Sequence, residues 1–153
     1  MKESLIKALT NGLHGINTHI DPKKAIDGLT STTAKLTLEN EFHSCWDLIH
    51  HMVVWQEAIF ETIRGNKVDW RKISEENNWP SMQFYEDDTN FDKLVEKFLA
   101  GIKIAEEFLK EVDLHKPMPG WSDEPTFQAF IVLLQHNSYH LGQLITVRRT
   151  LNI

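Results

Sequence analysis

Cysteine is nearly absent from the 153-residue chain, in which Cys45 is the only one. A single thiol excludes an intrachain disulfide and a cysteine-based zinc knuckle, so any metal must be held by nitrogen or oxygen. Long apolar runs are also missing, and none approaches the roughly 20 residues that a membrane span requires. The first residues, MKESLIKALTNGL, interleave polar and apolar side chains, unlike a secretory signal. We therefore expect a cytoplasmic protein with no membrane segment.

Basic charge is scarce as well. The chain has 16 Lys and Arg against 22 Asp and Glu, which gives a formal net charge of −6. Its only basic concentration is the pair Arg148 and Arg149, which is too small for a nucleic-acid footprint, so no nucleic-acid partner is expected. The apolar fraction of 41% and the charged fraction of 25% are those of a globular protein. The length suits a single domain over residues 1–153.

Apolar residues at helical spacing run through most of the chain, whereas strand-like alternation is rare. The pattern predicts long helices at residues 2–13, 41–65, 89–112 and 125–153. The second of these should end at Gly65. Four long helices predict an all-α four-helix bundle with long connections between the second and third helices and between the third and fourth.

The remaining segments are expected to be connections. Residues 21–29 suit a short helical turn with Asp21 as N-cap, Pro22 at the first helical position and Gly28 as terminator. Polar, β-branched residues 30–40 indicate a connector. Two longer segments follow: a polar connection over an end or side of the bundle at 66–88, and a loop at 113–124 whose prolines and glycine exclude regular structure.

Histidines occur at an interval that a core-forming helix does not need. His136 and His140 are four residues apart, which places them one turn apart on the same face of the last helix. Each buried imidazole must find a partner or lose about 1–3 kcal/mol. Water or hydroxyl partners near a bundle mouth would explain the pair, and so would a metal. On the second helix, His50 and His51 point roughly 100° apart, and periodicity does not choose which of them faces inward.

One histidine from the second helix with His136 and His140 would supply three neutral nitrogens. Three histidines hold zinc in open catalytic sites and leave a position for water or substrate. Nickel or ferrous iron accepts the same ligands, although zinc is the first expectation. Cys45 lies roughly 120° around the helix from His51 and is expected to be a small buried side chain. Three further histidines should be solvated or capping: His14, His19 and His115.

Three stretches carry a resemblance to a known family. FHSCWDLIHHMVVWQEAI (Phe42 to Ile59) has a tryptophan, a histidine five residues later and an aromatic residue four beyond that. HNSYHLGQLITVRRTL (His136 to Leu151) contains H-x-x-x-H-x-G-Q, and THIDPKKAIDGLT adds a weaker match. Together they resemble the DinB-like family, which includes the YfiT-like proteins.

The resemblance implies a fold, a site and a chemistry. The fold is a four-helix bundle with a metal between the helices, frequently assembled as a homodimer. Carried over to this sequence, the family's metal ligands are His51, His136 and His140, with His50 as a near neighbour. Characterised relatives include metal-dependent S-transferases that use small thiols such as bacillithiol, mycothiol or glutathione, and isomerases of thiol conjugates.

The leading functional hypothesis is therefore a metal-activated small-molecule thiol that attacks an electrophilic substrate. A metal-dependent hydrolase and a non-catalytic metal- or ligand-binding dimeric module are the alternatives. No general base is evident, although Asp47 and Glu57 lie on the ligand-bearing second helix. Gln143 is the best candidate to orient a ligand histidine, and Gly142 is expected to let a neighbouring helix approach closely.

Overall fold

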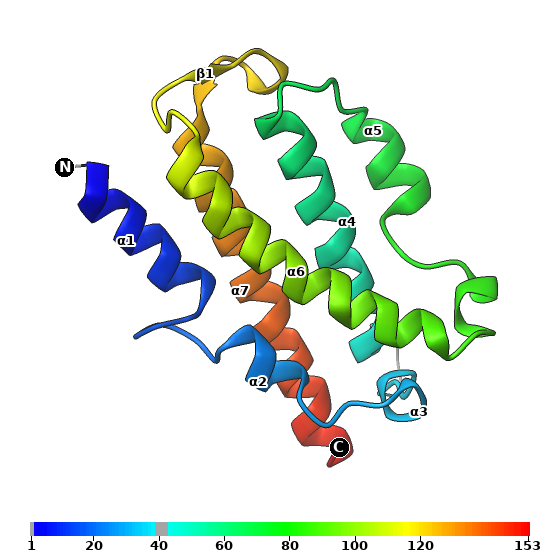
Figure 1. The fold of residues 1–153 in the computed structure, drawn as a ribbon. Coiled ribbons are helices and arrows are strands. Elements are labelled where there is room, and N and C mark those ends of the chain that lie inside the picture. The colour runs from blue at the N-terminus through cyan, green and yellow to red at the C-terminus, as the bar shows by residue number, and fades with distance from the viewer. Residues whose placement is uncertain (1, 39–42) are drawn as a thin grey trace.

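Four long helices dominate the computed structural model, which describes residues 2–38 and 43–153 (Figure 1). They are α1 (Lys2–Leu13), α4 (Cys45–Ile63), α6 (Thr89–Glu111) and α7 (Thr126–Leu151). Helix α4 packs against both α6 and α7, and α1 packs against the same two helices. The all-α class predicted from the helical spacing is confirmed.

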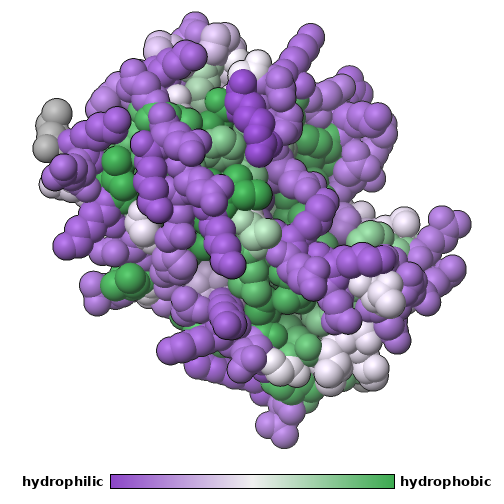
Figure 2. Space-filling model, in the orientation of Figure 1, coloured by the Kyte–Doolittle hydropathy of each residue, from purple (hydrophilic) through white to green (hydrophobic). Residues whose placement is uncertain are grey.

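The apolar faces of these helices meet in two groups of buried side chains. One group surrounds the fully buried Trp46, Phe91 and Phe98, and the other surrounds Phe130 and Leu133 at the opposite end. Burying a side chain of this size contributes roughly 1.5–3 kcal/mol. Polar side chains cover most of the face seen in Figure 2, with apolar atoms showing between them. Within the described residues, no helix combines the length and apolarity needed to cross a bilayer.

Helix α4 begins later than the spacing predicts, at Cys45 rather than residue 41. The Ser44 hydroxyl accepts a hydrogen bond from the Asp47 backbone N–H at 3.1 Å, and the Asp47 carboxylate accepts one from the Ser44 N–H at 2.8 Å. This reciprocal capping starts the helix and leaves His43 outside it; residues 41 and 42 lie outside the described residues. Gly65, with a φ of 86°, follows the last turn as predicted.

The first short helix, α2 (Pro22–Ile26), matches the expected turn. The Asp21 side chain accepts a hydrogen bond from the Lys24 N–H at 3.2 Å, and Gly28 follows with a φ of 78°. These interactions confirm the N-cap, the proline position and the terminator.

The predicted connector at 30–40 contains a further helical turn, α3 (Ser31–Ala34). Here Thr30 and Thr33 form a capping box, in which each side chain accepts a hydrogen bond from the other's backbone N–H at 3.0–3.2 Å. The β-branched threonines that suggested a connector therefore begin a helical turn, with Thr30 as its N-cap. Residues 39 and 40 lie outside the described residues.

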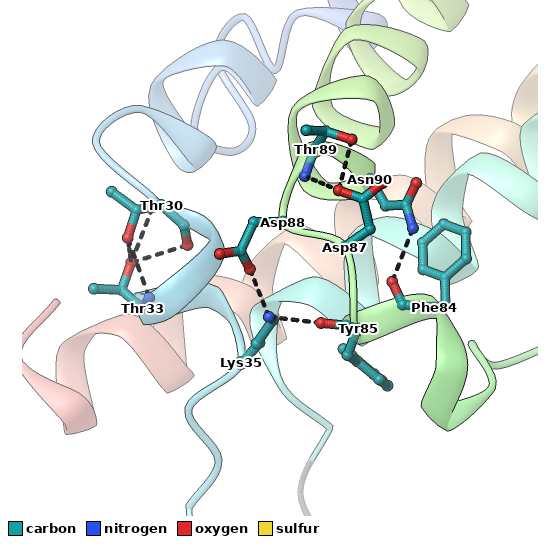
Figure 3. Close-up of polar contacts among 9 residues, drawn as sticks. All are labelled: Thr30, Thr33, Lys35, Phe84, Tyr85, Asp87, Asp88, Thr89 and Asn90. Atoms are coloured by element: carbon teal, nitrogen blue, oxygen red, sulfur yellow. Dashed lines mark hydrogen bonds and ion pairs between the residues drawn. The ribbon is translucent and has the colours of Figure 1, made fainter.

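Lys35, at the end of α3, ties three parts of the chain together (Figure 3). Its Nζ donates to the Tyr85 carbonyl oxygen and to the Asp88 carboxylate, both at 2.7 Å, and lies 5.0 Å from the Trp46 ring centroid. The Tyr85 hydroxyl in turn donates to Asp47 in the cap of α4. These bonds hold the first turns of α4, which carry His51.

The connection at 66–88 is built from short helical turns rather than extended chain. They are α5 (Trp70–Lys72), a π-helical turn η1 (Ile73–Asn77) and a 3₁₀ turn η2 (Met82–Tyr85). As expected, the connection packs on the side of the long helices, and Trp70 stacks on Trp55 of α4 with ring centroids 5.9 Å apart (Figure 1).

The prediction of no regular structure at 113–124 was wrong. Strands β1 (Pro117–Met118) and β2 (Glu124–Pro125) pair antiparallel around a 3₁₀ turn, η3 (Pro119–Trp121). A ladder of two residues per strand needs few backbone N–H donors. The flanking Thr126 N–H donates one hydrogen bond to the Lys116 carbonyl at 2.9 Å. Proline is tolerated at such positions.

Candidate metal centre

Three histidines from two helices converge between α4 and α7. His51 comes from α4, and His136 and His140 come from α7; their ring centroids are 4.4–4.8 Å apart. One nitrogen from each lies within 4.8 Å of the others. His51 is 7% exposed and His140 8%, and His136 is half-buried. This histidine cluster (His51, His136, His140) can hold a metal ion.

His50 faces away from the histidine cluster. Its ring packs edge-on against Phe84 with centroids 5.2 Å apart, and it lines a hollow together with Lys93 and Lys97 of α6. Burial lowers the pKa of His50. The structure thus places His51, and not its neighbour, beside the two histidines of α7.

The connection between α5 and α6 orients His51. Its Nδ1 donates to the Asn78 carbonyl oxygen at 3.2 Å, because a carbonyl can only accept. The same asparagine accepts a hydrogen bond from Trp55 Nε1 at 2.8 Å through its side chain. Trp79 stacks on the His51 ring at 4.4 Å and on the His43 ring at 3.4 Å, between the two imidazoles. With Nδ1 protonated, the Nε2 of His51 keeps its lone pair.

Gln143 orients the His140 ring in the same way. The Nδ1 of His140 lies 2.7 Å from Oε1 of Gln143, to which it donates a hydrogen bond. The amide nitrogen of Gln143 donates to the Tyr139 hydroxyl at 3.4 Å. Histidines that bind metals are oriented by such an acceptor on the second nitrogen. The expected contact between Gln143 and a histidine is present.

Burial keeps the histidine cluster uncharged. Together with repulsion from the neighbouring imidazoles, it lowers the pKa of His51 to about 4 and that of His136 to about 3. Burial also lowers the pKa of His140. The rings are therefore neutral near pH 7, which is the state that binds a metal.

The nitrogen atoms of the histidine cluster fit a divalent ion. His136 Nε2 donates to His51 Nε2 at 2.9 Å, and among the described residues the buried Nδ1 of His136 has no hydrogen-bond partner. Nitrogens bound to one tetrahedral zinc at about 2.0–2.1 Å lie roughly 3.3 Å apart, so the two rings need only a small shift. An ion would accept the Nε2 lone pairs of both rings in place of this hydrogen bond, and the His136 proton would then lie on Nδ1.

Two hollows flank the histidine cluster. On the His140 side, a cavity of about 510 Å³ lies against α7. This cavity, which we call the thiol-side cavity after the ligand proposed for it below, is lined by His43, Leu48, Tyr139, Gly142, Gln143 and Val147, among others. On the His136 side, a hollow of about 370 Å³ is bounded by Trp55, whose ring centroid is 5.9 Å from that of His136.

The other candidates lie outside the histidine cluster, as expected for His14, His19 and His115. His14 pairs with Glu106 at 2.8 Å, the Nδ1 of His19 donates to the Ile20 carbonyl, and the His115 ring packs near Phe127. Cys45 is fully buried, and burial raises its pKa to about 11. A protonated buried thiol is not a ligand, which agrees with the expectation for Cys45.

The contacts of Asp47, Glu57 and Gly142 decide the expectations for these three residues. Asp47 caps α4 and accepts from Tyr85, and Glu57 is exposed and pairs with Lys97 at 2.6 Å, so neither is a general base for the histidine cluster. The prediction for Gly142 was wrong: a Cβ there would meet no atom of the described residues within 4 Å. Gly142 faces the thiol-side cavity, whereas Gly101 admits a neighbouring helix at Gln56, as Gly12 does at Leu134.

His43, Asn78 and Trp79 are the site residues that the sequence did not reveal. His43 precedes the helix, so it has no periodic relation to His51. Asn78 and Trp79 reach the site by the fold of the connection. The one sequence feature that could have pointed to Asn78 and Trp79 is the stretch NNWP, whose single tryptophan belongs to no helical pattern.

A family model described as the DinB superfamily matches residues 23–144, a range that includes all three clustered histidines. A search of curated proteins and a search of solved structures each gave no match. Because the family model covers most of the chain, this protein belongs to the DinB superfamily.

Proposed function

We propose that this protein is a divalent-metal-dependent S-transferase, built on a DinB-type four-helix bundle, that joins a small thiol to an electrophilic carbon. The observation that carries the proposal is the convergence of three neutral imidazoles beside a cavity large enough for a small molecule. We place the ion on His51, His136 and His140, with zinc as the first expectation and nickel or iron as the others.

A divalent ion bound there would stabilise a thiolate, whose parent thiol otherwise has a pKa near 8.5. The chain supplies the orientation. Asn78 and Gln143 each accept a hydrogen bond from a ring N–H of the histidine cluster and so direct the other ring nitrogen to one point. Tyr139 and Thr146 bring hydroxyls to the thiol-side cavity, which can bind the polar body of a thiol.

The reaction is a substitution or an addition at carbon. The thiol loses its proton, its sulfur lone pair forms the new S–C bond, and the leaving group departs with the bonding pair. In an addition, the π electrons of the acceptor move to the neighbouring atom, which then takes up a proton. His43 also lines the thiol-side cavity, and we assign its imidazole as the group that accepts the thiol proton.

The remaining parts of the proposal follow from the family resemblance and, for the location, from the sequence. The thiol is one of the cell's low-molecular-weight thiols, the location is the cytoplasm, and two copies form a homodimer. Light scattering at micromolar concentration tests the dimer, and a mass equal to that of one chain would refute it.

Thiol transfer by protein purified without a polyhistidine tag tests the enzyme proposal. Bacillithiol, mycothiol and glutathione would each be offered with 1-chloro-2,4-dinitrobenzene, and turnover would be followed against bound metal. The matched variants are His51→Ala and His50→Ala, which remove adjacent histidines of the same helix. We expect loss of metal and turnover in the first and retention of both in the second.

Two other results would contradict the proposal. Metal bound with no turnover of any of these thiols would overturn the enzyme proposal and leave a metal-binding module. Equal loss in both variants would show that the histidine cluster as described is not the site of the reaction.

A further inference from the structure

Three tryptophans surround the hollow on the His136 side. They come from separate segments: Trp55 from α4, Trp70 from α5 and Trp121 from η3. Trp55 and Trp70 are stacked with centroids 5.9 Å apart and an interplanar angle of 17°, and Trp121 lies 5.6 Å from Trp70. Ile59 and Val132 complete the apolar wall. We call this hollow of about 370 Å³ the tryptophan pocket.

The tryptophan pocket is open to solvent rather than part of the core. Trp70 and Trp121 are only partly buried, whereas Trp46 is fully buried. None of the residues that line the pocket carries a charge. Apolar hollows of this size are typical of small-molecule sites, and the absence of a lining carboxylate argues for a neutral occupant rather than a cation.

The turn that holds Trp121 is strained. Ser122 and Asp123, which follow it, have φ angles of 53° and 58°, a conformation that residues other than glycine rarely adopt. The Asp123 N–H donates to the Met118 carbonyl at 3.2 Å and closes the turn. Strain of this kind persists where the surrounding structure over-determines it, often at ligand sites.

Trp55 is the wall that the tryptophan pocket shares with the histidine cluster. One neighbour of its ring is Trp70, and another is His136, with centroids 5.9 Å apart. Its Nε1 donates to the side chain of Asn78, whose backbone carbonyl holds His51. The Trp55 ring thus links the tryptophan pocket to His136, and Gln143, which binds His140, lines the thiol-side cavity.

We propose that the tryptophan pocket binds the flat aromatic part of the electrophilic acceptor. This inference rests on the proposed function. Electron-rich indoles stack favourably on electron-poor rings, and such a ring activates a carbon that belongs to it toward attack by a thiol. The acceptor carbon gains sulfur and releases its leaving group with the bonding pair, while the thiol enters from the thiol-side cavity.

Binding of 1,3-dinitrobenzene tests the tryptophan pocket without requiring a reaction, because this electron-poor ring has no leaving group. It would be titrated into metal-free and zinc-loaded protein with ¹⁵N-labelled indoles, with NMR signals assigned through single Trp→Phe variants. We expect the Trp70 and Trp121 indole signals to shift and the Trp46 signal to stay in place.

Two variants and a control make the test quantitative. Trp121→Ala should weaken dinitrobenzene binding at least tenfold, and Val132→Trp, which fills the pocket without removing its turn, should do the same. Met82→Ala removes an apolar side chain that is 82% exposed elsewhere and should leave binding unchanged. In turnover assays, Val132→Trp should raise KM for 1-chloro-2,4-dinitrobenzene at least tenfold and leave KM for iodoacetamide, which has no ring, unchanged.

The possible outcomes separate this inference from the proposed function. Dinitrobenzene binding at Trp70 and Trp121 without any thiol transfer would support the pocket and overturn the enzyme proposal. Thiol transfer with unmoved Trp70 and Trp121 signals would support the enzyme and overturn the pocket. Tighter binding of tetramethylammonium than of dinitrobenzene would also overturn the pocket's assignment to a neutral ring.

Discussion

Replacing Gln143 by alanine removes the acceptor that orients His140. The hydrogen bond lost is 2.7 Å long, and its donor belongs to a side chain that is 8% exposed. Removing such a partner of a metal ligand typically lowers metal affinity about 10–100-fold, or about 1.4–2.7 kcal/mol. Gln143 borders the thiol-side cavity, so water can replace part of the lost bond, and we expect a value near tenfold.

The assay is zinc affinity measured by competition with a chromogenic chelator, together with urea unfolding of the metal-free protein. Unfolding should become easier by about 1 kcal/mol, which corresponds to a melting temperature about 2–4 °C lower. Gln135→Ala, an exposed glutamine on the same helix, is the matched control. Gln143→Glu keeps an acceptor and should restore zinc affinity. Equal affinities for Gln143→Ala and Gln135→Ala would refute the orienting role.

Three further predictions concern protonation, helix packing and the Lys35 bonds. The histidine cluster is harder to protonate in the folded protein than in the unfolded chain, whose histidines titrate near pH 6.5. The unfolding free energy of metal-free protein should therefore fall as the pH drops from about 6.5 to 4, by up to about 1.4 kcal/mol per pH unit for each histidine. A plot of unfolding free energy against pH that is as flat as that of His51→Ala would contradict this. Gly142→Ala should stabilise α7 by about 0.5–1 kcal/mol because its Cβ meets open space. Gly101→Ala should destabilise the protein by about 1–3 kcal/mol because its Cβ clashes with Gln56 of α4. Thermal melts that rank the two variants the other way would refute the described packing of these glycines. Lys35→Met should destabilise the protein by about 1–3 kcal/mol in urea unfolding, and Asp88→Asn should have much less effect because that carboxylate is 65% exposed. Equal losses would show that only the surface ion pair matters.

The long helices could be predicted because each carries an apolar face with helical spacing. His136 and His140 could be paired for the same reason, since an interval of four residues on one helix fixes their common face. The adjacent histidines of α4 could not be separated by periodicity. The choice depends on what packs on each side: Phe84 covers His50, whereas Asn78 and Trp79 cover His51.

The parts that escaped prediction depend on contacts between distant segments. His43 joins the site because a tryptophan 36 residues later stacks on it, and nothing near His43 in the sequence indicates this contact. Gly142 suggested close helix packing, but a glycine on a helix is compatible equally with a close neighbour and with an open cavity. The strands at Pro117 and Pro125 are too short to leave an alternating pattern.

X-ray absorption at the zinc edge of the loaded protein tests most directly whether the histidine cluster shares one ion. We predict three imidazole nitrogens at about 2.0–2.1 Å, with the fourth position held by water or, after addition of a small thiol, by sulfur. Fewer than three imidazoles, or a sulfur ligand before any thiol is added, would contradict a centre formed by His51, His136 and His140.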